Sequence, residues 1–189
     1  MRLVGLLSAA VAFLLASPGV ASAAPSAPTP GSGRSDNPNC RKVLLGQPRH
    51  KGDIFYSASS TYGVSHGHIG LFSSKTRVTE ARGKGNASDN FLISGRRYCS
   101  KIDKMQVSTT QAKRDKAADY AAKYLIKKPY SGNFSWNKGG GISSLNCSEL
   151  VYKAYKRSVK IDLDGDGGLG VYPKDIRNSP RTKIYQTVV

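Results

Sequence analysis

Acidic residues are scarce in this chain of 189 residues. Only 12 Asp and Glu stand against 29 Lys and Arg, which gives a formal net charge of +17. A surface this positive attracts polyanions such as nucleic acid, anionic lipid head groups and phosphate-rich envelope polymers. The sequence shows no arginine-rich helix pattern, zinc knuckle or aromatic stacking motif, so a specific nucleic-acid partner is disfavoured. We therefore expect the basic surface to bind an anionic cell-envelope polymer.

Long apolar runs are also lacking. The clearest one lies at the N-terminus, where Arg2 precedes apolar residues 3–16 and a small-residue cleavage site at residues 21–23. This pattern predicts a secretory signal peptide over residues 1–23, and the run is too short to span a bilayer comfortably. No later stretch approaches about 18 apolar residues. We therefore expect a protein without a transmembrane segment that is secreted or associated with the cell wall.

Composition divides the rest of the chain into two parts. Residues 24–39 are rich in Ala, Pro, Ser and Gly, cannot bury a core and are predicted to form a disordered linker. Residues 40–189 are long enough for one ordinary domain with its own core. Internal repeats are not visible in the sequence, and we expect a monomer.

Cysteine is rare, and the count of three is odd for an exported chain. A disulfide between Cys40 and Cys99 would tie the start of the domain to its middle and leave Cys147 as a free thiol. The alternative is three buried free cysteines, which are typical of cytoplasmic chains and fit poorly with a signal peptide.

Cys147 lies in residues 146–149 (NCSE), which open an apolar-periodic segment and predict the first turn of a helix. A thiol there lies among unpaired backbone N–H groups, at the positive end of the helix dipole. Both features favour the reactive thiolate. The apolar face of this helix is expected to comprise Leu150, Val151, Ala154 and Tyr155. Cys147 is therefore a candidate nucleophile.

Sequence patterns predict the remaining elements. Short strands are expected over residues 52–56, where a turn comes first, and over residues 65–73, 77–81, 105–107 and 183–189. The second and third of these should form a hairpin through the loop at residues 73–76. Because strands and helices are segregated along the chain, we predict an α+β fold with a mainly antiparallel sheet.

A further helix is expected to begin at Ser108, which has capping-box spacing to Gln111, and to end before Pro129. Its apolar stripe should comprise Ala118, Ala121, Ala122 and Leu125. A Gly-, Ser- and Asn-rich loop over residues 130–145 then leads into the helix that carries the free cysteine.

His68 is the best partner for Cys147. It lies in the middle of a predicted strand close to apolar residues, where an imidazole is costly unless it is hydrogen-bonded or used in chemistry. A core histidine with a purely structural role is the competing interpretation. His66 points to the same face and is the alternative base, whereas His50 is expected at the surface.

Glu80 is placed to orient the imidazole of His68 and to stabilise its charged form. A hairpin centred near residue 74 would pair position 68 with position 80 on the same face of the sheet. The alternative is a surface carboxylate that pairs with Arg77 or Arg82.

Several strings in this order resemble one known family. They are residues 68–71 (HIGL), 79–81 (TEA) and 146–151 (NCSELV), with 52–54 (GDI) before them and 171–176 (VYPKDI) after them. Together they resemble the permuted branch of the papain-like, NlpC-type cysteine hydrolases, and in particular the YiiX/YebB-like group. In this branch the histidine precedes the cysteine, as it does here. The resemblance implies a circularly permuted papain-like fold in which an antiparallel sheet packs on helices, one of which carries the nucleophilic cysteine at its N-terminus.

The resemblance also implies roles for individual residues. Cys147 would be the nucleophile, His68 the general base and then the general acid, and Glu80 the orienting residue. The backbone N–H of Cys147 would stabilise the oxyanion, with Tyr130 and Ser148 as further candidates. No cofactor is required. The implied function is a secreted amidase or peptidase that cleaves cell-wall peptide or a related amide through a thioester, although the large basic excess is not typical of the group.

Three other functions remain open at this point. The first is a lipid esterase or acyltransferase of the same fold, which the lack of an amphipathic membrane-binding stretch disfavours. The second is a non-catalytic cationic module that binds the envelope. The third is a zinc protein that uses His66, His68 and Cys147 as ligands.

An acidic loop stands out in this basic chain. Residues 162–167 (DLDGDG) have the alternating carboxylates and the sixth-position glycine of a calcium loop. Position twelve of that loop is Pro173 instead of glutamate, which excludes a complete EF-hand. Asp162, Asp164 and Asp166 are therefore candidate ligands of a structural Ca²⁺ ion, and a solvated turn is the alternative.

Overall fold

The structure is a computed structural model that describes residues 40–189 except residues 59, 62, 63 and 66. The predicted signal peptide at residues 1–23, the predicted linker at residues 24–39 and His66 lie outside the described residues. Among the described residues, no helix is long and apolar enough to cross a membrane.

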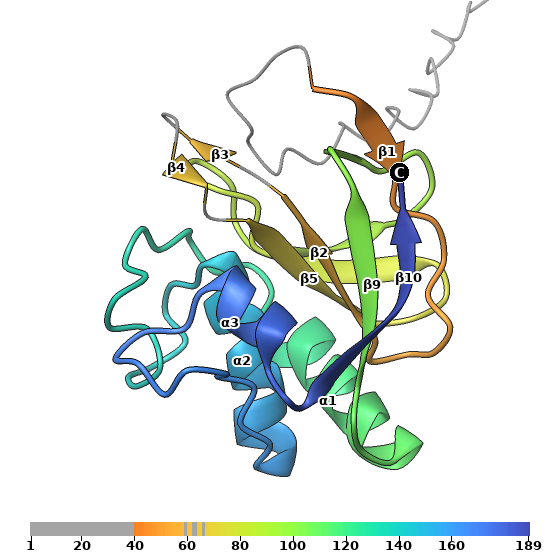
Figure 1. Cartoon of the computed structure of the whole chain (residues 1–189). Helices are drawn as coiled ribbons and strands as arrows, with labels where there is room; N and C mark the ends of the chain where they lie inside the picture. The colour runs from red at the N-terminus through yellow and green to blue at the C-terminus, as the bar shows by residue number, and fades with distance from the viewer. Residues whose placement is uncertain (1–39, 59, 62–63, 66) are drawn as a thin grey trace, which may run out of the picture.

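The described chain folds into strands and helices that follow one another in the order shown in Figure 1. The strands are β1 (Lys42–Leu44), β2 (Ile54–Ser57), β3 (Ser60–Thr61), β4 (Val64–Ser65), β5 (His68–Phe72), β6 (Arg77–Glu80), β7 (Asp89–Leu92), β8 (Arg97–Cys99), β9 (Ile102–Val107) and β10 (Thr182–Val188). The helices are α1 (Gln111–Tyr124), α2 (Cys147–Val159) and α3 (Pro173–Asn178).

A six-stranded sheet forms the centre of the fold. Its strand order is β10-β9-β2-β5-β6-β7, and all neighbouring pairs are antiparallel. Two small two-stranded sheets, β1-β8 and β3-β4, accompany it. The predicted α+β class with an antiparallel sheet is confirmed, whereas β1, β3, β7, β8 and α3 had no counterpart among the predicted elements.

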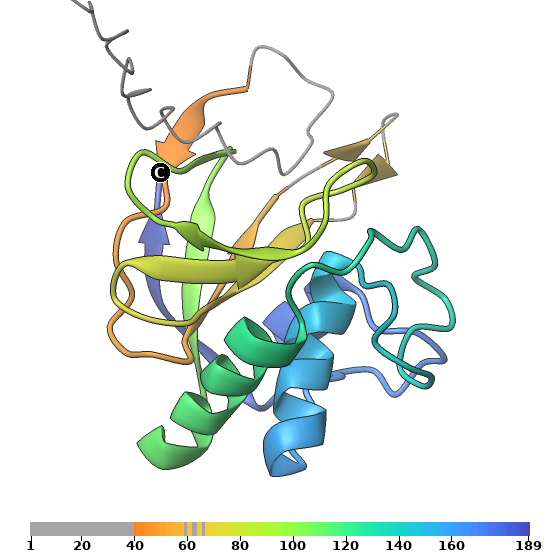
Figure 2. The same cartoon turned by 180° about the vertical axis from the view of Figure 1, so that it is seen from behind.

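The central strands bury side chains on both faces of the sheet. Ile54 of β2 and Leu71 of β5 pack on the face that α1 and α2 cover. Phe55 and Phe72, which alternate with them, pack on the opposite face with residues of β1 and β8. Both views show the helices on one side of the sheet, with the start of α2 close to the strands and its end far from them (Figures 1 and 2).

The hairpin of β5 and β6 has the predicted loop at residues 73–76, but the predicted register is wrong. Leu71 pairs with Thr79, which places Glu80 opposite Gly70 and diagonal to His68. A shift of two residues keeps every side chain on its own face because strand side chains alternate with a period of two. Glu80 therefore still shares a face with His68.

The predicted start of the first helix is also wrong. Helix α1 begins at Gln111 because the side chain of Thr110, and not that of Ser108, accepts the hydrogen bond from the backbone at the N-terminus. The helix ends at Tyr124, before Pro129 as predicted. Of the predicted stripe, Ala118, Ala121 and Leu125 are fully buried and Ala122 is half-buried.

The Cys40–Cys99 disulfide is present, with the two Cα atoms 5.4 Å apart. It joins the start of the described chain to β8, next to the pairing of Lys42 with Cys99 in the β1-β8 sheet. Cys147 is the free cysteine of the described residues and is buried.

Candidate active site

Cys147 is the first residue of α2 and is only 2% exposed. Asn146 caps the helix: its side chain accepts a hydrogen bond from the backbone N–H of Glu149 at 2.8 Å. The carboxylate of Glu149 accepts one from the backbone N–H of Asn146 at 3.3 Å. This capping box fixes the first turn, where backbone N–H groups have no partner within the helix. The thiol is thereby held at the positive end of the helix dipole.

The hydroxyl of Ser148 has a structural role. It is buried and donates to the carbonyl of Val171 at 2.7 Å and to the side-chain oxygen of Asn146 at 3.0 Å. A hydroxyl has a single hydrogen, which these acceptors already share. The predicted oxyanion role of the Ser148 side chain is therefore not supported, and this side chain instead anchors the segment around residue 171 to the start of α2.

His68 is the first residue of β5 and is 4% exposed. Its Nε2 atom lies 2.7 Å from Oε2 of Glu80. Hydrogen bonding and charge of the Cys147 side chain raise the pKa of the imidazole, which places the sulfur beside the ring. Because Nε2 is used by the carboxylate, Nδ1 is the nitrogen left for the sulfur. The structure thus brings together the three predicted catalytic residues in one buried cluster, in which His68 is hydrogen-bonded to Glu80 and Cys147 lies beside the ring.

The electrostatics of this chain favour a charged imidazole. Burial alone lowers the pKa of His68, but hydrogen bonds and charge interactions with Cys147 and Glu80 outweigh it and raise the pKa from 6.5 to about 9. Burial likewise raises the pKa of Glu80, and interactions with His68, Arg96 and Tyr98 outweigh it and keep that pKa below its ordinary value. At neutral pH, a positive His68 therefore lies against a negative Glu80.

Glu80 is held by two residues that sequence reasoning missed. The guanidinium of Arg96 donates to Oε1 at 2.7 Å, and the hydroxyl of Tyr98 donates to Oε2 at 2.8 Å. All three side chains are buried, so the alternative of a surface carboxylate is wrong. The sequence did contain a signal for these residues. Arg96 and Tyr98 are two positions apart, so their side chains can lie on the same side of an extended chain, and they come just before Cys99, which the disulfide holds near the sheet.

Aromatic packing fixes the plane of the imidazole. The ring of His68 stacks on that of Tyr98 with centroids 5.5 Å apart, and Phe55 lies 5.7 Å away. Gly70 provides the space for this arrangement. A Cβ atom at that position would lie 2.5 Å from the Phe55 ring and 3.3 Å from Cβ of Glu80, and the first distance is a clash.

Tyr130 lies beside the candidate nucleophile. It forms an isolated parallel bridge with Leu145, two residues before Cys147. Burial, followed by the neighbouring charge of Cys147, raises the pKa of the Tyr130 hydroxyl. The hydroxyl consequently stays protonated at physiological pH and is available as a hydrogen-bond donor.

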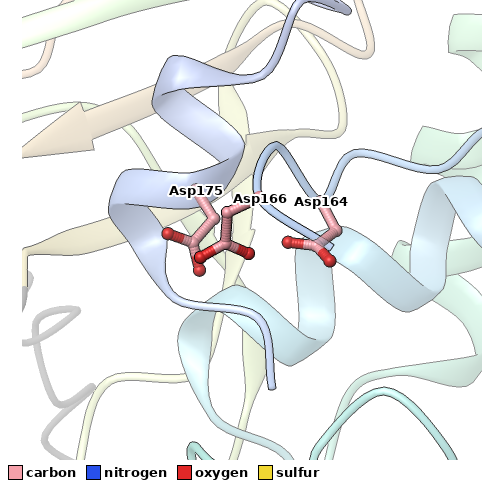
Figure 3. Close-up of side chains that lie close together, drawn as sticks. All are labelled: Asp164, Asp166 and Asp175. Atoms are coloured by element: carbon pink, nitrogen blue, oxygen red, sulfur yellow. The ribbon is translucent and has the colours of Figure 1, made fainter. Parts of the chain in front are cut away.

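The acidic loop is arranged differently from the prediction. Ligand atoms of Asp164, Asp166 and Asp175 all lie within 4.8 Å of one another, and their carboxylates gather between the loop and α3 (Figure 3). Asp162 does not belong to this group, and its carboxylate pairs with Lys156 at 2.7 Å. The carboxylates that lie together thus differ from the predicted ligands: Asp162 is outside the group, and Asp175 of α3 is part of it.

Comparison with solved structures identifies the class of fold. The structure of metalloprotein YiiX from Escherichia coli O157:H7 superposes with a TM-score of 0.51 and 20% sequence identity, covering 76% of this chain and 97% of YiiX. The chain therefore has a YiiX-like α+β fold, as the resemblance predicted. No family model matches the sequence.

Comparison of sequences gives one curated relative. The chain is 32% identical over 149 residues to the uncharacterized protein YycO of Bacillus subtilis (strain 168). The match covers 73% of this chain and 56% of YycO, so the chain spans little more than half the length of this relative.

The charged state of His68 can be tested without a substrate. We expect histidine-selective NMR to give a midpoint near the pKa of about 9 for His68, and a lower midpoint in the Cys147→Ala variant. The variant loses the hydrogen bond and charge of Cys147 that raise the pKa, while the opposing effect of burial remains. The imidazole should accordingly lose its proton at lower pH than in the wild type. An identical midpoint in both proteins would show that Cys147 does not contact the ring.

Proposed function

We propose that the chain is a cysteine-dependent hydrolase that cleaves an amide bond, with Cys147 as nucleophile, His68 as general base and acid, and Glu80 as the residue that orients His68. The observation that carries this proposal is the buried cluster in which His68 is hydrogen-bonded to Glu80 and interacts with Cys147, which raises its pKa. A nucleophile, a base and an orienting third group within hydrogen-bond reach are the signature of nucleophilic catalysis.

Acylation follows from this geometry. The thiolate of Cys147 attacks the carbonyl carbon of the amide, which forms a C–S bond and places the carbonyl electron pair on the oxygen. When the tetrahedral intermediate collapses, the C–N bond breaks and the charged His68 gives its proton to the leaving nitrogen. The products of this step are a free amine and a thioester on Cys147.

Deacylation regenerates the enzyme. His68, now neutral, accepts a proton from a water molecule as the water oxygen attacks the thioester carbon. The C–S bond breaks, the sulfur leaves as thiolate, and the acid product departs. Throughout, Glu80 accepts a hydrogen bond from Nε2 at 2.7 Å and stabilises the positive charge on the ring.

Two donors are suited to stabilise the oxyanion. The backbone N–H of Cys147 lies in the first turn of α2, where it has no intrahelical acceptor. The hydroxyl of Tyr130 is the second candidate, since its raised pKa keeps it protonated beside the sulfur. In this proposal the fold is a circularly permuted papain-like fold, with α2 as the helix that carries the nucleophile.

A polar cavity beside α2 favours a peptide or amide substrate; Cys147 and His68 do not line it, so it would hold a part of the substrate away from the scissile bond. It is lined mainly by the loop over residues 131–144, together with Glu149 and Lys153 of the helix. Serine, asparagine and glycine dominate this lining, with Trp136 as its aromatic member. Such groups match the N–H and C=O groups of a peptide better than a hydrocarbon chain.

Charge and disulfide support a location in the cell envelope. The formal net charge of +17 favours binding to an anionic polymer, and the Cys40–Cys99 disulfide fits an oxidising compartment outside the cytoplasm. We infer that the protein is exported, acts as a monomer on cell-wall peptide or a related amide, and is held there by its basic surface.

An ester of a lipid is the second candidate substrate. Trp136 and Leu169 are 67% and 69% exposed, and Tyr172 is also exposed. Their two segments lie together, because Asn137 and Val171 exchange hydrogen bonds of 3.0 and 2.8 Å. Exposed apolar side chains on adjoining loops are typical of surfaces that contact lipid or apolar ligands.

The name of YiiX raises a metal-dependent mechanism as a further possibility. Among the described residues, however, the one group with three or more suitable ligands is Asp164, Asp166 and Asp175, which contains neither His68 nor Cys147. The imidazole nitrogen that faces Glu80 is already hydrogen-bonded. The donor set at the candidate active site therefore fits thiol chemistry better than metal chemistry.

The proposal is tested by incubating residues 24–189 with purified peptidoglycan fragments and reading the products by mass. We expect a mass gain of one water distributed over two products, loss of this activity after iodoacetamide treatment, and full activity in EDTA. A lipid ester is tested in a parallel reaction. Activity that survives iodoacetamide and disappears in EDTA would overturn the cysteine mechanism, and polymer binding without any cleavage would indicate a non-catalytic module.

A further inference from the structure

A lysine ammonium lies within the acidic loop, at a place where a metal ion would bind. The Nζ atom of Lys138 contacts a carboxylate oxygen of Asp164 and the backbone carbonyl of Gly168. Counted from residue 162 as position one, these are positions three and seven of a calcium loop, which supply a carboxylate and a backbone carbonyl to the ion. The protein thus places its own cation between two of the oxygen atoms that bind calcium in such loops.

One oxygen of this loop has no hydrogen-bond partner among the residues that the structure describes. The side chain of Asp164 is only 4% exposed, and its Oδ2 atom contacts Lys138. Its Oδ1 atom is buried and has no hydrogen-bond partner within the described part of the chain. A carboxylate oxygen removed from water without a partner is costly. The close approach of Asp166 and Asp175, visible in Figure 3, adds like charges and raises that cost.

The charges of the group do not balance. Three carboxylates and one ammonium give a formal charge of −2 within a few ångström. The backbone brings the loop close to α3, because the glycine at position 165 lets the two segments pack together. A Cβ atom on Gly165 would lie 2.7 Å from the carbonyl oxygen of Asp175. One oxygen of Asp175 accepts the backbone N–H of Tyr172 at 2.7 Å, which fixes its carboxylate beside the loop.

We propose that Asp164, Asp166, Asp175 and the carbonyl of Gly168 form a binding site for a hard divalent cation such as Ca²⁺, and that Lys138 is the competing cation of the site. All donors are oxygen atoms, which calcium prefers. Binding displaces the ammonium, lowers the formal charge of the group from −2 to −1 and gives the buried oxygen of Asp164 a ligand. This site is independent of the proposed hydrolase activity.

The test is calorimetric titration of residues 24–189 with CaCl₂ at low ionic strength, with terbium luminescence as a second readout. We expect one ion per chain. In Lys138→Met the affinity should rise about tenfold because the competing charge is gone. In Asp166→Asn it should fall about tenfold or more because a ligand charge is lost. Asp166 is exposed, so this variant should fold normally.

Asp162→Asn is the matched control, since it removes the same charge from the same loop at a residue outside the group. Its affinity should stay within about threefold of the wild type. The proposal is overturned if neither the wild type nor Lys138→Met binds Ca²⁺ at millimolar concentration. It is also overturned if Asp162→Asn weakens binding as much as Asp166→Asn does.

Discussion

Replacement of Cys147 by alanine is expected to lower kcat for amide hydrolysis by about 10⁴- to 10⁶-fold, the range seen when a member of a catalytic triad is removed. The neighbouring Ser148 is not placed to replace the sulfur, because its hydroxyl is used in hydrogen bonds to Val171 and Asn146. His68→Gln should cause a loss of the same order, since the base and acid disappear together. The measurement is the initial rate on the substrate identified by mass.

The double variant Cys147→Ala/His68→Gln should be no slower than either single variant. Residues that act as one unit are strongly non-additive, because the second change removes a function that the first has already disabled. His50→Gln is the matched control: it removes a histidine that is exposed and whose ring contacts only Gln106 among the hydrogen bonds observed here. The assigned roles would be wrong if His50→Gln lowered kcat as much as His68→Gln does. They would also be wrong if the reductions in kcat caused by Cys147→Ala and His68→Gln multiplied in the double variant.

Local sequence signals were sufficient to predict that Cys147 lies in the first turn of a helix and that His68 has partners within the fold. The start of α2 is encoded within four residues, because Asn146 and Glu149 satisfy each other's backbone groups whatever the rest of the chain does. His68 was indicated by its position in an apolar strand, where burial of an imidazole demands partners. Both inferences depend on interactions between residues that are close in the sequence, and these can be recognised in a single sequence.

Features that depend on distant parts of the chain were not predictable in this way. The register of β5 and β6 differs by two residues from the one a symmetric loop suggests. Arg96 and Tyr98 contact Glu80 because the chain returns to the site after β7, and no local period encodes that return. Asp175 joins the acidic group for a similar reason, since α3 packs against a loop that precedes it.

Replacement of Arg96 by leucine is the change with the largest expected effect on stability. The guanidinium is 2% exposed, and it contacts Oε1 of Glu80 at 2.7 Å and the carbonyl of Leu92 at 3.1 Å. Loss of one partner from a buried ion pair typically costs about 3–5 kcal/mol, because the remaining charge stays buried without compensation. Since His68 and Tyr98 still contact Glu80, we expect about 3 kcal/mol, measured by urea denaturation at pH 7.

Arg97→Leu provides the matched control, because it removes the same charge from the adjacent, exposed residue and should change the free energy of unfolding by less than about 0.5 kcal/mol. The two variants should also differ in pH dependence. In the wild type the pKa of Glu80 is lower in the folded state than its ordinary value of 4.5, so its contribution to stability is present above pH 4.5 and is lost as the pH falls through the folded-state pKa. The difference in the free energy of unfolding between Arg96→Leu and Arg97→Leu should therefore become smaller in acid. If this difference were the same at pH 7 and pH 3, Arg96 would stabilise the fold by packing and not by its charge interaction with Glu80.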